Sequence, residues 1–277
     1  MTAVRTLVAT HDIHIRKKLG QAFLEDMRTI RKIALLAAPG AEETIVEIGA
    51  GLGHMTEELA KTAGRVIALE IDPQLLKVLR ERFGRRKNVE VVDKDVLKYD
   101  FSQADKVRKI KVVGNIPYYI SSPILFRLLS FRREASSFLL MFQKEFAERV
   151  TAGPGTKQYG IPSVMVSKYT DASCEMIVSP QCFYPPPAVA SCVVRMTVKE
   201  GTDDPDEKFF EKLVRAAFAH RRKNILNNLL YLGFSRDALG VLLSECRIAP
   251  ERRAETLTLE EFTTLSVFLA ESAQQKA

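Results

Sequence analysis

The sequence contains, at residues 44–53, the stretch Thr44-Ile45-Val46-Glu47-Ile48-Gly49-Ala50-Gly51-Leu52-Gly53, in which an apolar run leads directly into glycines at alternate positions. The apolar run predicts a buried strand, and the pattern of residues 55–63 predicts a helix directly after the turn. Glycines between a strand and a helix let the backbone approach a ligand where helix N–H groups face outward. The stretch therefore favours nucleotide-type binding. A mere tight turn remains the alternative, because the spacing departs from the Gly-x-Gly-x-x-Gly dinucleotide pattern.

The same alternation of strands and helices continues along the chain. Helices are predicted at 30–36, 73–83 and 144–150, and further strands at 65–70, 89–92, 111–113, 137–142, 174–178 and 191–198. Strands spaced by helices indicate an α/β fold with a mostly parallel sheet and right-handed crossovers. The last two strands lack a long helix between them, so we expect an antiparallel pair at one edge.

A domain boundary is predicted at residues 201–206, which read Gly-Thr-Asp-Asp-Pro-Asp. Beyond it the patterns are all helical, at 209–232, 236–245 and 259–271. The sequence therefore predicts a large domain over residues 1–200 and a small all-α domain over 201–277.

Composition excludes several classes of protein. No apolar run approaches the roughly 20 residues of a membrane span, and the N-terminus lacks the apolar region of a signal peptide. Cys174, Cys182, Cys192 and Cys246 form no Cys-x-x-Cys pair and have no histidines at ligand spacing. We therefore expect reduced thiols in a cytoplasmic protein that holds no metal and contacts no membrane.

The charge is unevenly distributed along the chain. Residues 1–198 carry 29 basic and 21 acidic side chains, whereas residues 199–277 carry 12 and 13. A basic balance in one part suits a polyanionic partner, although a solvated basic surface explains it equally well. Two clusters are candidates for phosphate contacts, which position a nucleic acid without reading its sequence. They are Arg16, Lys17 and Lys18 near the N-terminus, and Arg221, Arg222 and Lys223 on the helix predicted at 209–232.

Acidic side chains follow two of the predicted strands. Glu70 ends the second strand, 19 residues after Gly51, where an acidic residue accepts hydrogen bonds from ribose hydroxyls. Asp95 follows the third strand and is a candidate acceptor for an adenine amino group, with Ile71 and Val96 as apolar faces for the ring. Each acid alone could be a surface carboxylate. Together they indicate an adenosine-bearing cofactor, and the lack of a pyrophosphate-sized loop favours S-adenosylmethionine over a dinucleotide.

The fourth predicted strand ends in the turn Gly114-Asn115-Ile116-Pro117-Tyr118. Asn-x-Pro-Tyr brings together an amide side chain, a carbonyl fixed by proline and an aromatic face. Those groups are what is needed to hold the exocyclic amino group of a nucleobase.

Taken together, these motifs resemble those of the small-subunit ribosomal RNA adenine N6,N6-dimethyltransferase family. The resemblance runs from Lys18 to Phe262. In order, its elements are Gly20-Gln21-x-Phe23-Leu24, Glu47 to Gly53, Glu70-Ile71-Asp72, Asp95-Val96, Asn115-Ile116-Pro117-Tyr118, Gln143-Lys144-Glu145, Phe183-x-Pro185-x-Pro187-x-Val189-x-Ser191, Phe218 to Lys223, and Arg253-Ala254-Glu255-x-Leu257.

The resemblance implies a Rossmann-like methyltransferase sheet with a reversed last strand, followed by a small helical domain that binds RNA or the ribosome. It implies a monomer that dimethylates two adjacent adenines of small-subunit rRNA within a pre-assembled subunit. The cofactor contacts that it implies are Gln21, Leu24, Gly49, Glu70, Asp95 and Asn115, and Gly51 of the glycine-rich turn is a further candidate. Position 22 departs from the family pattern, because Ala22 stands where Asn is usual. We expect this to weaken cofactor binding by about 0.5–1.5 kcal/mol if the Asn side chain normally bonds the cofactor. A contact made by the backbone would lose nothing.

For the chemistry, the resemblance implies methyl transfer to adenine N6, whose lone pair is delocalised into the ring. The Asn115 side-chain oxygen and a carbonyl at Ile116 or Pro117 are predicted to accept the N6 hydrogens and aim the lone pair. Tyr118 and Phe183 are predicted to sandwich the base, with a buried core aromatic as the alternative for Phe183. Two other functions stay open: a large-subunit adenine methylase of the macrolide-resistance type, and an RNA-binding assembly factor with little catalysis.

Overall fold

The computed structural model describes residues 3–16, 20–201 and 206–274, which form two compact units. The first unit comprises the described residues of Met1–Ala147 and Asp171–Val198. The second comprises those of Glu148–Thr170 and Lys199–Ala277. The sequence-based boundary placed 148–170 in the first domain, whereas the structure groups this segment with the C-terminal helices.

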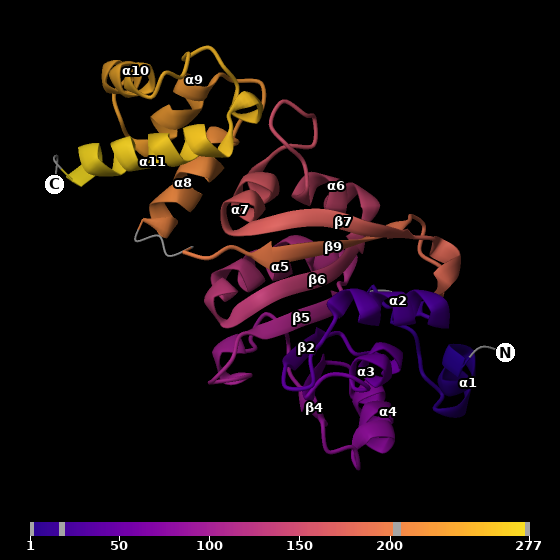
Figure 1. Ribbon diagram of the computed structural model, residues 1–277. Coiled ribbons are helices and arrows are strands. Elements are labelled where there is room, and N and C mark those ends of the chain that lie inside the picture. The colour runs from indigo at the N-terminus through magenta and orange to yellow at the C-terminus, as the bar shows by residue number, and fades with distance from the viewer. Residues whose placement is uncertain (1–2, 17–19, 202–205, 275–277) are drawn as a thin grey trace. The chain divides into compact units, whose positions relative to one another are not determined.

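A seven-stranded sheet forms the centre of the first unit (Figure 1). Its order is β4 (Val89–Asp93), β3 (Arg65–Glu70), β2 (Thr44–Ile48), β5 (Ile110–Asn115), β6 (Ala135–Gln143), β9 (Ser191–Val198) and β7 (Thr170–Val178). The first five strands in this order, β4, β3, β2, β5 and β6, pair in parallel, and β9 runs antiparallel to β6. This confirms the predicted α/β fold, its mostly parallel sheet and its reversed last strand.

The central strands are apolar because both of their faces are covered, as is usual in parallel sheets. All five residues of β2 are buried. Helices α2 (Met27–Ala37) and α3 (His54–Leu59) pack their apolar residues against β2, β3 and β5 in one core cluster. Helix α4 (Pro73–Phe83) begins as predicted, with Asp72 accepting a hydrogen bond from the backbone of Gln74 and Pro73 in the first turn.

Several shorter elements complete the first unit. Strands β1 (Phe23–Leu24) and β8 (Phe183–Tyr184) form a separate two-stranded antiparallel sheet. Helix α6 (Lys144–Val150) has the predicted bounds, and its last three residues are grouped with the second unit. Helices α1 (Ala3–Thr10) and α5 (Ser121–Ser130) were not predicted. In α5 the early Pro123 and the three serines obscure the helical pattern. The 3-10 turns are η2 (Phe101–Gln103), η3 (Tyr118–Ile120), η4 (Arg132–Glu134) and η5 (Pro180–Cys182).

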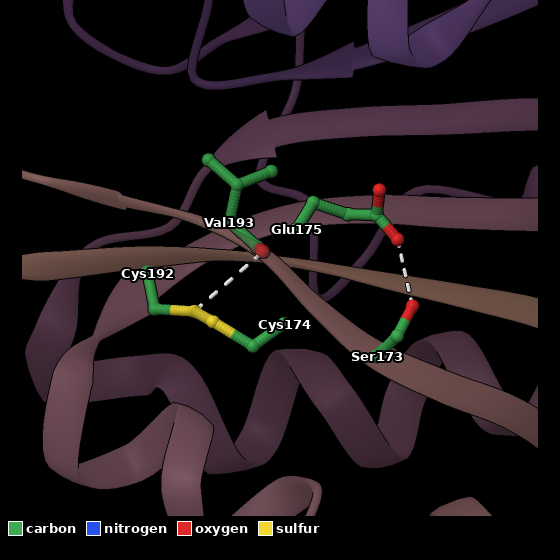
Figure 2. Close-up of a disulfide and its surroundings, with 5 residues drawn as sticks. All are labelled: Ser173, Cys174, Glu175, Cys192 and Val193. Atoms are coloured by element: carbon green, nitrogen blue, oxygen red, sulfur yellow. Dashed lines mark hydrogen bonds between the residues drawn. A yellow bond between two sulfur atoms is a disulfide. The ribbon is translucent and has the colours of Figure 1, made fainter.

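The expectation of reduced thiols is wrong for two of the four cysteines. Cys174 on β7 and Cys192 on β9 form a disulfide (Figure 2). The two residues lie on neighbouring strands, with 6.5 Å between their Cα atoms, so the sheet itself brings the thiols together. Cys182 and Cys246 are free. The sequence could not show this, because the pairing depends on which strands become neighbours.

The described part of the second unit is helical. It contains α7 (Ile161–Tyr169), α8 (Glu207–Ala217), α9 (Ile225–Leu229), η6 (Leu230–Leu232), α10 (Arg236–Glu245), η7 (Ala254–Thr256) and α11 (Leu259–Gln274). Helix α7 packs against α8 and α11. The Phe218 ring contacts the rings of both Tyr159 and Phe262, with centroid distances of 6.0 and 5.9 Å. This packing explains why residues 148–170 belong to this unit.

The continuous helix predicted at 209–232 is wrong. Helix α8 ends at Ala217, a turn follows over 218–224, and α9 starts with Asn224 as its N-cap. The buried Asn228 amide donates hydrogen bonds to the carbonyls of Ala217, at 2.7 Å, and His220, at 3.1 Å. These tertiary bonds satisfy carbonyls at the helix end and stabilise the break, which helical periodicity alone does not reveal.

Across the described ranges of the chain, no helix is both long and apolar enough to span a lipid bilayer.

Candidate active site

A cavity of about 350 Å³ lies at the carboxyl ends of β2, β3 and β5 in the first unit. Ligands of open parallel sheets bind at this edge. All ten residues predicted to hold the cofactor line the cavity: Gln21, Ala22, Leu24, Gly49, Gly51, Glu70, Ile71, Asp95, Val96 and Asn115. Pro117 and Tyr118 line it as well. The cavity therefore brings together residues that are far apart in the sequence.

The glycine-rich turn between β2 and α3 forms one wall of the cavity. Gly49 and Gly51 have φ angles of +69° and +58°, which L side chains rarely adopt. A Cβ atom on Gly51 would lie 3.4 Å from the ring of Phe23, and one on Gly49 would lie 3.6 Å from the carbonyl oxygen of Asn115. These distances are ordinary contacts, so it is the positive φ angles that favour glycine at both positions and leave the backbone bare beside the cavity.

The Glu70 carboxylate holds two loops of the cavity together. One oxygen accepts a hydrogen bond from the Gly51 N–H at 2.9 Å, and the other accepts from the N–H groups of Ile71 and Asp72 at 2.8 and 2.9 Å. Burial raises the pKa of Glu70, and these three bonds oppose that effect. Glu70 thus fixes the glycine-rich turn relative to the end of β3.

Asp95 and its neighbours, which follow β4, form another part of the cavity wall. The Asp95 carboxylate is half-buried and accepts a hydrogen bond from the Leu97 N–H at 2.9 Å through one oxygen. Val96 is buried and Ile71 is 53% exposed. An acceptor thus lies among two apolar side chains, one of them open to solvent.

Among the cavity residues that were not singled out from the sequence, Glu47 and His54 have strongly shifted pKa values. Glu47 on β2 is buried and accepts a hydrogen bond from the Thr56 hydroxyl at 2.6 Å. Burial raises its pKa to about 8, assisted by the nearby Glu70. Burial also lowers the pKa of His54, the first residue of α3, to about 4. The signal for Glu47 was available, because a carboxylate in the middle of an apolar strand is unusual.

Side-chain hydrogen bonds connect the segment before α2 to Asp72, which follows β3. The Gln21 amide donates to Asp72 at 2.8 Å and accepts from the Arg16 N–H at 2.7 Å. Arg16 also lies 3.6 Å from the buried Asp72 carboxylate, so the predicted phosphate-binding residue already has an acidic partner. Lys17 and Lys18, the other predicted members of this cluster, lie outside the described residues.

The orientation of Asn115 is set by a bond to the same segment. Its amide nitrogen donates to the carbonyl oxygen of Ala22 at 3.1 Å. That assignment leaves Oδ1 as the acceptor, and none of the described residues donates a hydrogen bond to it. The nearby Pro117 carbonyl accepts from the Ile120 N–H at 3.1 Å, in the 3-10 turn η3.

Tyr118 is half-buried, and its hydroxyl is 2.7 Å from the hydroxyl of Ser191, the first residue of β9. Ser191 is fully buried. Burial raises the pKa of Tyr118, and the bond to Ser191 opposes that effect. The next residue, Tyr119, also lines the cavity and is 58% exposed, although sequence reasoning did not identify it.

Phe183 lies elsewhere. It is 1% exposed and belongs to the core cluster, where it packs with Leu139, Met141 and Val193. Those three residues line the cavity, whereas Phe183 does not, so its ring lies behind the wall. The structure therefore does not bring Phe183 to the position of a stacking residue, and its environment is that of a core aromatic.

The second predicted basic cluster lies in the second unit, but not on a helix. Arg221, Arg222 and Lys223 are exposed in the turn between α8 and α9. Arg221 donates to the carbonyl of Lys157 at 2.6 Å and lies 3.7 Å from Glu255, so it is partly occupied within the unit.

Comparison with known proteins is consistent with this geometry. The family model described as ribosomal RNA adenine dimethylase matches residues 13–271. The chain is 46% identical over 276 residues to the ribosomal RNA small subunit methyltransferase A of Syntrophus aciditrophicus, covering 96% of this chain and 98% of that one. Its identity to the protein of the same name from Bacillus mycoides is 42%, covering 95% and 94%.

Two solved structures share the fold over nearly the whole chain. A dimethyladenosine transferase from Plasmodium falciparum superposes with a TM-score of 0.80 at 28% identity, covering 91% of this chain and 98% of that one. The 23S rRNA methyltransferase ErmE superposes with a TM-score of 0.70 at 27% identity, covering 90% and 99%. With the family model matched over most of its length, the chain belongs to the ribosomal RNA adenine dimethylase family.

Proposed function

We propose that the protein transfers methyl groups from S-adenosylmethionine to N6 of two adjacent adenines in small-subunit ribosomal RNA. The observation that carries the proposal is a single cavity lined by Glu70, Asp95 and Asn115, which lie at or just beyond the ends of β3, β4 and β5. The relatives named above, at 42–46% identity, support the small subunit as the substrate.

The residues of the cavity fit S-adenosylmethionine. Glu70 has two carboxylate oxygens beside the glycine-rich turn, where they can accept from ribose hydroxyls. Asp95 supplies an acceptor for the adenine amino group, and Ile71 and Val96 supply apolar contacts for the ring. When bound, the cofactor supplies a methyl group on a positively charged sulfur.

Asn115 positions the acceptor nitrogen. Its Oδ1 can accept one N6 hydrogen, because its amide nitrogen is fixed on the Ala22 carbonyl. A carbonyl at Ile116 or Pro117 accepts the second hydrogen and so draws N6 toward a pyramidal geometry. No strong base is needed, since the N6 proton becomes acidic once the nitrogen is methylated.

A base inside a helix cannot enter such a cavity, so the target adenine is unpaired or flipped out. Tyr118 supplies a stacking face held by Ser191. Tyr119, exposed at the cavity, is a better placed partner than the buried Phe183. We further propose a monomeric cytoplasmic enzyme that acts on a partly assembled subunit.

Methyl incorporation from labelled cofactor tests the function directly. The acceptors are unmethylated small subunits, large subunits and protein-free rRNA, and nucleoside mass spectrometry identifies the product. We expect N6,N6-dimethyladenosine in small subunits alone. Label confined to large subunits would instead identify a large-subunit methylase. Retained RNA binding without label would identify an assembly factor.

Loss of the bond between Tyr118 and Ser191 should slow methyl transfer. Ser191→Ala leaves a half-buried hydroxyl without its partner and frees the ring, at a cost of about 1–2 kcal/mol. We expect a 5- to 30-fold fall in kcat with a smaller change in the KM for RNA. Tyr118→Phe removes the same bond by deleting the other hydroxyl, so its kcat should fall by a similar factor. The double variant should be no slower than either single variant. Normal turnover by Tyr118→Phe would show that the bond does not position the ring.

Restoring the usual family residue at position 22 tests the role of its side chain. The Ala22 carbonyl already holds Asn115, and this contact does not depend on the side chain. An added amide should contribute one further bond to the cofactor, worth about 0.5–1.5 kcal/mol. Titration calorimetry should therefore show two- to tenfold tighter cofactor binding by Ala22→Asn. Unchanged affinity would mean that the backbone alone makes the contact.

A further inference from the structure

An exposed aromatic pair lies in the second unit, beside the basic turn at residues 218–224. Tyr231, in η6, is 59% exposed. The His220 ring packs against it at 5.3 Å between centroids. Lys223 lies with its ammonium nitrogen 5.6 Å from the centre of the Tyr231 ring and 3.3 Å from its hydroxyl. Large exposed aromatics that carry a cation are typical of interaction sites.

The three cations of the turn have different surroundings. Arg221 is engaged by the Lys157 carbonyl and Glu255. Lys223 is held on Tyr231. Arg222 is exposed and makes no ion pair or side-chain hydrogen bond with any described residue. Arg221 therefore stabilises the turn, whereas Arg222 and Lys223 present charge beside the aromatic pair.

The turn is fixed before any ligand arrives. The buried Asn228 amide bonds the carbonyls of Ala217 and His220, which sets the turn relative to η6. The neighbouring Asn227 side chain accepts a bond from Arg236 at 2.7 Å, which connects α9 to α10. A rigid site loses less conformational entropy on binding.

We infer that Tyr231, His220, Lys223 and Arg222 form a binding site for an unpaired RNA nucleotide, with the base on the aromatic pair and the phosphate on the cations. This inference rests on the proposed function, because it names a second place where the same RNA is held. Aromatic faces accept any unpaired base by stacking, and adjacent cations hold its backbone. The site positions RNA and takes no part in methyl transfer.

Charge and shape favour this ligand over others. Residues 199–277 are close to neutral overall, with 12 basic and 13 acidic side chains, so the positive charge at residues 221–223 is local. A duplex would contact only the cations, because its bases are stacked inside the helix. A protruding tyrosine beside two cations is matched by a single strand, which offers both a free base face and a phosphate.

Oligouridine carrying one photoreactive 5-iodouridine tests the site with the full-length protein. The probe contains no adenine, so it cannot be methylated at N6, and the position of the cross-link shows which site holds it. After irradiation, we expect the cross-linked peptide to contain Tyr231. Fluorescence anisotropy should show about tenfold weaker binding by Tyr231→Ala, whereas Tyr231→Phe, which keeps the ring, should bind as the wild type does. Val241→Ala is the matched control, since Val241 is equally exposed in the same unit.

The salt dependence separates stacking from phosphate contact. Arg222→Ala should reduce the slope of log affinity against log salt by about one, whereas Tyr231→Ala should weaken binding without changing the slope. The inference is overturned if Tyr231→Ala binds within twofold of the wild type, or if a duplex of equal length binds as tightly as the single strand. Methyl incorporation by the wild-type protein is measured in parallel. If methylation is normal and Tyr231→Ala binds normally, only this site is refuted. If methylation is absent but Tyr231 is cross-linked, the proposed function is refuted and this site is not.

Discussion

The Asn115→Ala variant is expected to lose about 100-fold or more in kcat while remaining folded and able to bind RNA. Asn115 combines a tether and an acceptor: its nitrogen is fixed on the Ala22 carbonyl, and its Oδ1 is left to receive the N6 hydrogen. Groups fixed in advance at the reacting atom typically contribute two to three orders of magnitude in rate. Single-turnover methylation of unmethylated small subunits measures the effect on the chemical step.

The matched control is Asn88→Ala. Asn88 also donates its amide hydrogens to backbone carbonyls, those of Ala60 and Ala63, at 2.9 and 3.1 Å, but it does not line the cavity. This control should lose about 1 kcal/mol of stability for each bond removed and keep its turnover. Asn115→Asp retains an acceptor but cannot donate to the Ala22 carbonyl. Its kcat should lie between those of Asn115→Ala and the wild type. Near-normal turnover by Asn115→Ala would refute the assignment.

The second large effect is expected from Glu47→Gln, on the pH dependence of stability. Burial raises the pKa of Glu47 from an ordinary value of 4.5 to about 8. The folded state therefore holds a proton that the unfolded state releases above pH 4.5. Stability falls as pH rises from 4.5 toward 8, and the fall ends once both states are ionised. Gln cannot ionise, so the variant should lack this fall.

A neighbour limits the range over which the effect is visible. Burial lowers the pKa of His54 from 6.5 to about 4, so protonation of the unfolded state makes stability rise with pH between those values. The two residues oppose each other below pH 6.5, and between pH 6.5 and 8 Glu47 acts without that opposition. There, Glu47→Gln should gain up to about 2 kcal/mol relative to the wild type, at about 1.4 kcal/mol per pH unit. Urea denaturation at pH 6.5, 7.2 and 8 measures the difference. A constant difference between the two proteins would show that Glu47 is ionised throughout.

Local patterns predicted the parallel sheet well. These predictions depend only on residues that are adjacent in the sequence, such as the apolar runs of β2 and β3 and the Asp72-Pro73 start of α4. The break between α8 and α9 could not be predicted in this way, because Asn228 creates it by bonding Ala217 and His220 across the turn. The pairing of Cys174 with Cys192 has the same cause, since it depends on which strands become neighbours.

In the candidate site, too, local motifs predicted some positions, whereas others depend on contacts between distant residues. Residues at the ends of recognisable strands, such as Asn115 and Glu70, were assigned to the cavity from the sequence, and they line it. The position of Phe183 could not be read from its motif, because burial depends on Leu139, Met141 and Val193 from other strands. Likewise, the distinction between Arg221 and Arg222 depends on Lys157 and Glu255, which are distant in sequence.

The way the chain divides between its two units limits how such a protein can be rearranged by recombination. The chain passes from one unit to the other after residues 147, 170 and 198. A single crossover near residue 200 would exchange α8 to α11 but leave α7, with which α8 and α11 pack, in the parental half. Tyr159 and Phe218 would then come from different parents although their rings are in contact. The helical unit can be inherited intact only when both of its segments are exchanged together.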